Sequence, residues 1–162
     1  MRYFLLLLTL VCVKTTAQNN QHFAFTLHAN GNPVKCYDNV HMKEVRYAIY
    51  PLKKENNVGA IVQLRHTTEN HIAIVVNGET TYVKKGCLAV NTRNYDGETL
   101  YMYSKPDYNS KVVHKTTQEH TVTIYDICNG WLYVCLNNNH REKVYGWIAP
   151  DMQCPNPVTT CP

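Results

Sequence analysis

Residues 129–134 read Asn-Gly-Trp-Leu-Tyr-Val, and this stretch decides the fold. An Asn-Gly pair tolerates positive φ and favours a tight turn, and the aromatic and branched residues after it are typical of a strand. Residues 145–148 (Tyr-Gly-Trp-Ile) follow this stretch, and residues 100–106 (Leu-Tyr-Met-Tyr-Ser-Lys-Pro) precede it. The three stretches predict β-structure bounded by turns in the second half of the chain.

The rest of the chain has the same local pattern. Short runs rich in Val, Ile, Tyr and Thr, each bounded by Asn, Gly, Pro or Asp, predict strands at residues 47–50, 60–64, 71–76, 80–83, 122–127 and 131–136. The Asn77-Gly78 pair between two of these runs predicts a hairpin. Long helical periodicity with caps is absent from the sequence. We therefore predict an all-β protein with at most single helical turns after Val83 and Ile148.

The second half resembles a bacterial Src-homology-3 domain, a small five-stranded barrel that binds and does not catalyse. In that family a first strand ends in a Ser-x-Pro turn, here residues 104–106. An Asn-Gly-Trp turn opens the middle strand, here residues 129–131, and a Gly-Trp-aliphatic step closes the barrel, here residues 146–148. The resemblance covers about residues 97–153. Tyr103 stands where the family usually has Arg, and Lys105 where it has Gly, so the resemblance implies a loop that binds a different ligand.

The first half can be laid over the second half. Residues 33–37 match 99–103, residues 71–76 match 131–136, and residues 81–83 match 146–148, with offsets of 66, 60 and 65. Any two β-rich stretches align when shifts are free, and this is the alternative to duplication. We predict two tandem five-stranded Src-homology-3-like barrels, stapled by disulfides: residues 18–91 form a divergent first barrel, residues 92–153 the second, and residues 154–162 a tail rich in Pro and Cys.

Residues 1–17 have the features of a signal peptide: a positive start at Arg2, an apolar run over residues 4–13 and a small-residue cleavage site at residues 15–17. The apolar run is too short to cross a bilayer of about 30 Å as a helix. Val11 precedes Cys12, and this argues against lipid attachment, which needs a small residue there. We expect cleavage near Ala17 and a secreted or periplasmic protein with no membrane span.

The charge of the mature chain is close to neutral. The whole chain has a formal net charge of +4, and removal of Arg2 and Lys14 with the signal lowers it to +2. A nearly neutral chain gives no electrostatic reason to expect nucleic acid as a partner. The Asn residues do not lie in Asn-x-Ser/Thr sequons, which favours a bacterial periplasm over a eukaryotic secretory route.

Six cysteines remain after the signal: Cys36, Cys87, Cys128, Cys135, Cys154 and Cys161. An even number in an exported chain indicates disulfides. The resemblance places the first and last strands of a barrel side by side, which implies a Cys36–Cys87 bridge. A short turn at residues 129–130 separates Cys128 from Cys135 by roughly 13 Å along the strand, beyond the ~7 Å that a bridge allows. We therefore expect both to join the tail cysteines, with a looped-out Cys128–Cys135 bridge as the alternative.

Catalytic and metal-binding patterns are not evident in the sequence. Pairing would leave no thiol as a nucleophile, the eight histidines show no spacing that gathers three ligands, and Gly-rich phosphate loops are absent. We expect neither an enzyme nor a cofactor or metal site.

Tyrosine is the exception in the composition, with twelve residues in the chain. Tyr can bury its ring and keep its hydroxyl in water, which suits a binding surface. If Leu132 and Val134 face inward, Trp131 and Tyr133 face outward. The alternative is that about half of the aromatic residues fill a small barrel core. We predict four ligand-binding residues: Tyr103, Tyr108, Trp131 and Tyr145.

These observations support a non-catalytic, exported binding module. The resemblance implies cell-wall peptides as ligands, and a protein partner is the other target that an aromatic groove suits. An inhibitor or immunity protein that blocks a periplasmic hydrolase or toxin is the alternative from another class, because a small rigid stapled scaffold suits it equally.

Overall fold

The computed structural model describes residues 21–41, 43–52, 57–137 and 142–161. Within these ranges the chain is all-β, as predicted, and has three single 3-10 turns in addition to its strands. The strands are β1 (His22–Leu27), β2 (Val34–Tyr37), β3 (Val45–Ile49), β4 (Val58–Thr67), β5 (His71–Val76), β6 (Glu79–Lys84), β7 (Leu88–Thr92), β8 (Leu100–Tyr103), β9 (Val112–Thr116), β10 (Thr121–Cys128), β11 (Trp131–Asn137), β12 (Lys143–Ile148) and β13 (Gln153–Cys154). The turns are η1 (Ala29–Gly31), η2 (Tyr95–Gly97) and η3 (Pro150–Met152).

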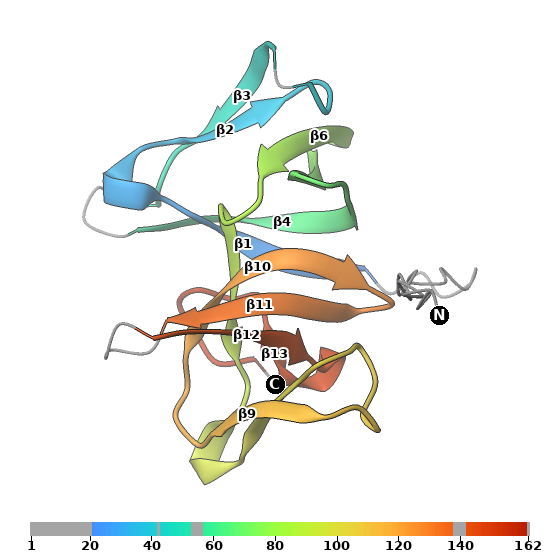
Figure 1. Ribbon diagram of the computed structural model, residues 1–162. Helices are drawn as coiled ribbons and strands as arrows, with labels where there is room; N and C mark the ends of the chain where they lie inside the picture. Colours follow the sequence, from blue (N-terminus) through green and yellow to red (C-terminus); the bar gives the residue numbers. More distant parts are fainter. Residues whose placement is uncertain (1–20, 42, 53–56, 138–141, 162) are drawn as a thin grey trace, which may run out of the picture.

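The described strands form one antiparallel sheet in the order β3-β2-β6-β5-β4-β1-β7-β10-β11-β12-β8-β9, and β13 pairs with β7. Figure 1 shows strands of the first half in the upper part of the molecule and strands of the second half in the lower part. The central ladder β1–β7–β10 connects the two parts.

The strand order is the same in both halves. Reading inward from each edge gives β3-β2-β6-β5-β4-β1 on one side and β9-β8-β12-β11-β10-β7 on the other. The register agrees at the positions matched in sequence: Tyr37 pairs with Tyr82, and the matching Tyr103 pairs with Trp147. Each half therefore has the same succession of antiparallel neighbours.

The expected division into two separate five-stranded barrels is not confirmed. β7 crosses the expected boundary at residue 91 and pairs with β1 of the first half as well as with β10 and β13 of the second. Phe25 lies opposite Ala89, and Thr123 lies opposite the same Ala89 on the other side. The backbone hydrogen bonds thus run from one half into the other without a break.

Most local predictions agree with the structure. Each predicted strand overlaps an observed one, and Asn77-Gly78 forms the turn between β5 and β6 with φ of 53° and 82°. A single helical turn follows Ile148, as predicted. After Val83 there is no helical turn, and a turn with Gly86 at φ 87° leads from β6 to β7.

The core is a cluster of buried aliphatic side chains from both halves. Ile72 and Ile74 of β5 are fully buried, as are Leu132 and Val134 at the matching positions of β11. The side chains of a strand point alternately to its two faces, so these residues share the inner face. The inward orientation predicted for Leu132 and Val134 is confirmed. One packed interior therefore supports both halves.

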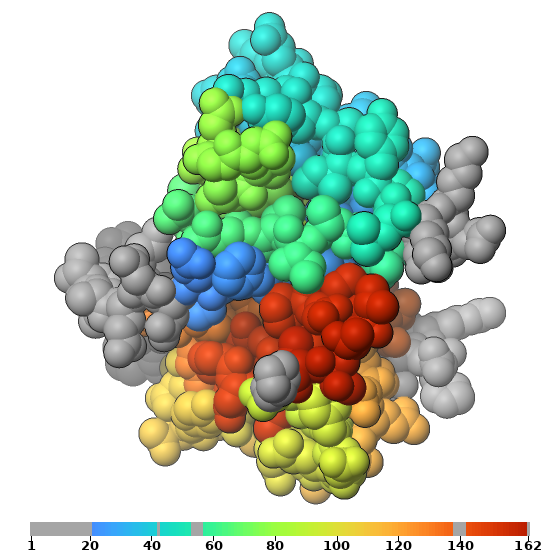
Figure 2. Space-filling view, turned by 180° about the vertical axis from the view of Figure 1, so that it is seen from behind, coloured from blue at the N-terminus to red at the C-terminus, as the bar shows by residue number. Residues whose placement is uncertain are grey.

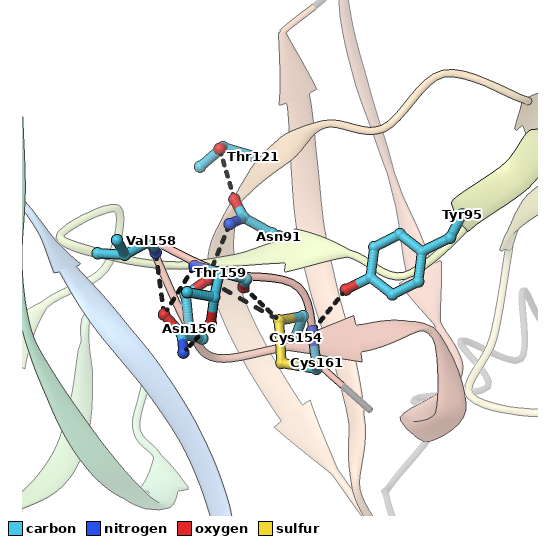
Figure 3. Close-up of a disulfide and its surroundings, with 8 residues drawn as sticks. All are labelled: Asn91, Tyr95, Thr121, Cys154, Asn156, Val158, Thr159 and Cys161. Carbon is cyan, nitrogen blue, oxygen red and sulfur yellow. Dashed lines mark hydrogen bonds between the residues drawn. A yellow bond between two sulfur atoms is a disulfide. The ribbon is translucent and has the colours of Figure 1, made fainter.

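The C-terminal segment is fixed by a disulfide and by hydrogen bonds to the second half. Cys154 and Cys161 form a bridge with an S–S distance of 2.03 Å. The Asn91 side chain donates to the Asn156 carbonyl (2.9 Å), and the Cys161 amide donates to the Tyr95 hydroxyl (3.0 Å), as Figure 3 shows. From the opposite side of the molecule, Figure 2 shows this segment in red beside the blue first strand.

The disulfide pairing expected from the sequence needs correction. Cys154 pairs with Cys161, so neither is bonded to Cys128 or Cys135. Cys36, Cys87 and Cys135 are free thiols, which also excludes the looped-out Cys128–Cys135 bridge and the Cys36–Cys87 bridge from this structure. The tail can close on itself because residues 155–160 turn back through hydrogen bonds to the Asn156 side chain.

The predicted signal peptide, residues 1–17, lies outside the described residues. Within the described part, no helix has the length and apolar character needed to cross a membrane.

Candidate aromatic binding surface

The structure brings three of the four predicted site residues together. Trp131 begins β11, Tyr103 ends β8, and Tyr108 lies in the loop between β8 and β9. Trp131 contacts Tyr103 and Tyr108 edge to face, with ring centroids 5.5 and 4.7 Å apart, and the two tyrosine rings are 6.0 Å apart. Edge-to-face contact is a favoured geometry for aromatic pairs. We call these three side chains the aromatic triad.

Trp131 differs from the exposed anchor that the sequence predicts. Only 7% of its surface is exposed, whereas Tyr108 is 58% exposed. The indole lies outside the aliphatic core cluster, and the two tyrosine rings pack against it. Leu132 and Val134 face inward, as the strand alternation predicts. The indole is nevertheless buried because Tyr108 contacts it from a loop that is distant in sequence.

The loop that carries Tyr108 is held by its own polar groups. The Ser104 amide donates to the Lys111 carbonyl (2.8 Å), and the Asn109 amide donates to the Asp107 carboxylate (2.9 Å). A third hydrogen bond runs from the Tyr108 hydroxyl to the Asp151 carboxylate in η3 (3.0 Å). The loop therefore presents the Tyr108 ring in a defined position beside a carboxylate.

The turn before Trp131 fixes the position of the indole. Asn129 and Gly130 have φ of 47° and 85°, the left-handed region in which glycine has no steric penalty. A Cβ atom at Gly130 would also lie 2.8 Å from the His22 ring. The Gln153 side chain donates to the Gly130 carbonyl (2.8 Å). This turn therefore requires glycine both for its conformation and for its close contacts.

Tyr145 belongs to a second group of aromatic side chains. Its ring lies 5.7 Å from Tyr125 and 6.2 Å from Tyr133, and Tyr133 lies 5.3 Å from Trp147. Trp147 is the strand partner of Tyr103, so this group borders the aromatic triad. Tyr145 is thus a neighbour of the triad and not a member of it.

Tyr101 extends the triad, with its ring 6.5 Å from that of Tyr103.

The sequence prediction did not select Tyr125 or Asp151. The two-residue period of β10 could have indicated Tyr125, because Val122 and Ile124 are buried. No comparable local signal marks Asp151. Its role depends on the distant Tyr108.

The hydroxyls of Tyr103, Tyr108 and Tyr145 stay protonated at neutral pH. Burial raises the pKa of Tyr103, and the nearby Tyr101 and Asp151 raise it further. Burial and the hydrogen bond to Asp151 raise the pKa of Tyr108. A hydrogen bond with the Cys135 thiol is the largest of several causes that raise the pKa of Tyr145 to about 12. The surface therefore offers neutral rings and hydroxyls next to one carboxylate.

Such a surface can stack on flat or apolar groups and form hydrogen bonds with amides. Among the described residues, no group of three His, Cys, Asp or Glu side chains is arranged to hold a metal ion.

Comparisons with known proteins gave structural likenesses alone. No protein-family model matches the chain, and no curated protein matches it. Two solved structures from Trichomonas vaginalis, of NlpC2 and NlpC1, are each 18% identical to it with a TM-score of 0.36. These alignments cover 85% and 86% of this chain, and it spans about half of each solved chain, 49% and 47%.

Proposed function

We propose that this protein is an exported, non-catalytic binding module of the periplasm or cell surface, and that its aromatic surface recognises cell-wall peptides or a protein partner. The proposal includes cleavage of a signal peptide near Ala17 and an origin of the fold in two tandem Src-homology-3-like units. The observation that carries it is the aromatic triad, in which a half-exposed ring covers a buried indole.

The triad has the composition of a recognition surface. Aromatic side chains concentrate binding energy at interfaces, because a rigid ring offers a large contact area at a small cost in conformational entropy. Tyr108 at 58% exposure and Tyr101 at 42% leave large ring areas in contact with water. The matching first-half position of Tyr101 is Lys35. The aromatic character is therefore not a requirement of the strand arrangement.

The equal strand order of the halves supports the proposed duplication. Two unrelated halves would not need the same succession of six neighbouring strands or the same register at the pairs Tyr37–Tyr82 and Tyr103–Trp147. β7 then serves as the last strand of the first unit and the first strand of the second, which is how two units can share one sheet.

Retention on purified peptidoglycan sacculi tests the binding function. We expect the wild-type protein to sediment with sacculi and Tyr108→Ala to stay in the supernatant. Tyr50→Ala is the matched control, because Tyr50 is also exposed (68%) and lies in the first half. Equal sedimentation of Tyr108→Ala and the wild type would contradict the assignment of the site.

Crosslinking in a cell lysate tests the protein-partner form of the proposal and the inhibitor alternative. One tight partner that is lost in Tyr108→Ala, without retention on sacculi, would support a protein target. If that partner were a hydrolase or toxin whose activity falls on binding, the inhibitor or immunity function would replace the cell-wall function. If the protein is neither retained on sacculi nor crosslinked to a partner, both the binding function and the inhibitor alternative are contradicted.

A further inference from the structure

A cavity of about 510 Å³ opens in the first half, and its described lining includes no residue of the aromatic triad. It lies where η1, the start of β2 and the turn between β6 and β7 meet, and Leu27, Pro33 and Val34 form part of its apolar wall. This volume is within the range of roughly 300–1,000 Å³ that is usual for small-molecule sites. The cavity is therefore large enough for a small-molecule ligand or a short peptide segment.

The charge on the cavity is positive. Lys35 and Lys84 line it, and its described lining residues include no Asp or Glu. The ion pair found among the described residues joins Arg46 to Glu79, so neither lysine is neutralised by an ion pair there. Lys84 is also close enough to the Cys87 thiol to oppose the rise in pKa that burial causes. Positive charge over apolar walls attracts an anion, because the low-dielectric wall concentrates the field.

The walls of the cavity are fixed by internal hydrogen bonds. His28 is 1% exposed, and its Nδ1 lies 2.9 Å from the Asn32 carbonyl oxygen. A carbonyl can only accept, so Nδ1 carries the hydrogen, and in the neutral ring Nε2 accepts from the Thr26 hydroxyl at 2.9 Å. A methyl group at Gly59 would collide with His28 and Thr26, which explains glycine there. This frame holds the wall in place before any ligand binds.

The positive pair is not a requirement of the fold. In the alignment of the halves, Lys35 corresponds to Tyr101 and Lys84 to Ala149, and Ala149 is 2% exposed. The second half therefore forms the same strands without either lysine. A strand arrangement that tolerates tyrosine and alanine at these positions leaves the two lysines available for a separate role.

We propose that this cavity binds a carboxylate at the end of a short apolar chain, and that the free carboxyl terminus of a peptide with small side chains supplies it. The lysines would face the carboxylate, and Leu27 and Val34 would contact the side chains. Asn32 and Asn57 also line the cavity, and an asparagine amide can form hydrogen bonds with a peptide group. A hydrocarbon tail offers no group that could form these hydrogen bonds, and for this reason we choose a peptide over a fatty acid.

Titration of the full-length, isotope-labelled protein by NMR tests this site. The probes are acetyl-Ala-Ala with a free carboxylate, the same peptide with a terminal amide, and octanoate, all at physiological salt. We expect the free acid to shift the amide signals of Leu27, Gly86 and Cys87 and to bind at least tenfold more tightly than the amide form. Equal binding of acid and amide would overturn the proposal. Binding of octanoate without acetyl-Ala-Ala would overturn the peptide assignment.

Lysine variants locate the site. The double variant Lys35→Gln/Lys84→Gln should bind acetyl-Ala-Ala at least tenfold more weakly than the wild type. Its other amide signals should keep their positions, because both lysines are exposed and their replacement should not disturb the fold. Lys143→Gln, an exposed lysine in β12, should bind as the wild type does. Unchanged affinity in the double variant would exclude this cavity.

The inference goes beyond the proposed aromatic site and stands independently of it. Tyr108→Ala should keep the affinity for acetyl-Ala-Ala even where it loses retention on sacculi. Loss of acetyl-Ala-Ala binding in Tyr108→Ala would place the carboxylate at the aromatic surface and overturn the second site.

Discussion

The two halves of the molecule share an interior and differ at the surface. Cys36 and Met102 occupy matching positions on β2 and β8, and both are fully buried. Val83 of β6 and Ile148 of β12 match in the same way. Outside, Lys35 of the first half corresponds to Tyr101 of the second, and His71 corresponds to Trp131.

The difference shows which positions the strand arrangement constrains. Interior positions keep apolar side chains, because a polar group buried there without a hydrogen-bond partner would be costly. Outer positions are free to become a cationic cavity in one half and an aromatic surface in the other. The shared sheet supplies the frame, and the surface of each half determines what that half can bind.

The largest expected effect comes from a core substitution in the first half. Ile72→Ala should lower the free energy of unfolding by about 2–5 kcal/mol, because it leaves a cavity among fully buried side chains. Both tryptophans, Trp131 and Trp147, lie in the second half. Since the core cluster joins the halves, the thermal midpoint followed by tryptophan fluorescence should fall as well.

Leu132→Ala at the matching position of the second half is the control and should lower the same transition. A fluorescence midpoint that moves for Leu132→Ala and stays constant for Ile72→Ala would show that the halves unfold independently. That result would restore the interpretation of two separate domains.

Trp131→Ala should affect stability and binding together. The indole is 7% exposed and contacts two tyrosine rings, so its loss should cost about 3 kcal/mol, the lower end for a buried aromatic side chain. Retention on sacculi should also fall, because Tyr103 and Tyr108 lose the ring against which they pack. Denaturant unfolding and sedimentation with sacculi measure the two effects.

His71→Ala is the matched substitution in the first half and should change both quantities little, because His71 is partly exposed. A stability loss for His71→Ala as large as that for Trp131→Ala would mean that this position supports the fold in both halves. The contrast between the two surfaces would then disappear.

Local sequence patterns were sufficient for six of the strands and for the hairpin at Asn77-Gly78, because each depends on neighbouring residues. Residues 71–76 have the branched side chains of a strand, and Asn77-Gly78 has the turn chemistry that closes a hairpin. The continuity of the sheet could not be predicted in this way. It depends on β7 pairing with β1 and β10, and strand pairing over such separations has no local signature.

The aromatic site was predicted in part for the same reason. The sequence indicated Tyr103, Tyr108, Trp131 and Tyr145 as one group, but Tyr145 packs with other aromatic side chains. The burial of Trp131 depends on a loop more than twenty residues away. The disulfides were harder, because six cysteines allow fifteen pairings and the sequence does not contain the distances that decide among them.

The tail disulfide lies in the second half, and its removal should have a moderate effect. Cys161→Ala opens a loop with a sequence separation of 7, which in the loop-entropy model costs about 2 kcal/mol. The hydrogen bond from Asn91 to Asn156 should hold part of the tail in place. Denaturant unfolding curves of Cys161→Ala and the wild type measure the loss in the free energy of unfolding. If a reductant left the stability of the wild type unchanged, a stabilising role of the disulfide would be contradicted.

The free thiols of the first half should react slowly at neutral pH. Burial and the neighbouring Cys87 raise the pKa of Cys36 to about 11, and burial raises the pKa of Cys87. The thiolate is the nucleophile, and its fraction grows as the pH rises toward the pKa. Below that pKa, alkylation of Cys36 should therefore become about tenfold faster for each unit by which the pH is raised. We expect Cys87, which is partly exposed, to be modified by iodoacetamide before Cys36, as peptide mass mapping at pH 8 to 9 would record. If Cys36 and Cys87 reacted with iodoacetamide only after reduction, they would form the bridge expected from the sequence and the prediction of free thiols would be wrong.

Tyr108→Phe should have the smallest effect and separates the ring from its hydroxyl. The substitution removes one hydrogen bond, to the Asp151 carboxylate, at an exposed position, so the stability change should stay within about 0.5 kcal/mol. The phenylalanine ring keeps the edge-to-face contact with Trp131, and we expect sacculi to retain the variant nearly as well as the wild type. Tyr50→Phe in the first half gives the background change for an exposed tyrosine. If Tyr108→Phe abolished retention while Tyr50→Phe did not, the hydroxyl and Asp151 would be the recognition element, and the ring would serve to position them.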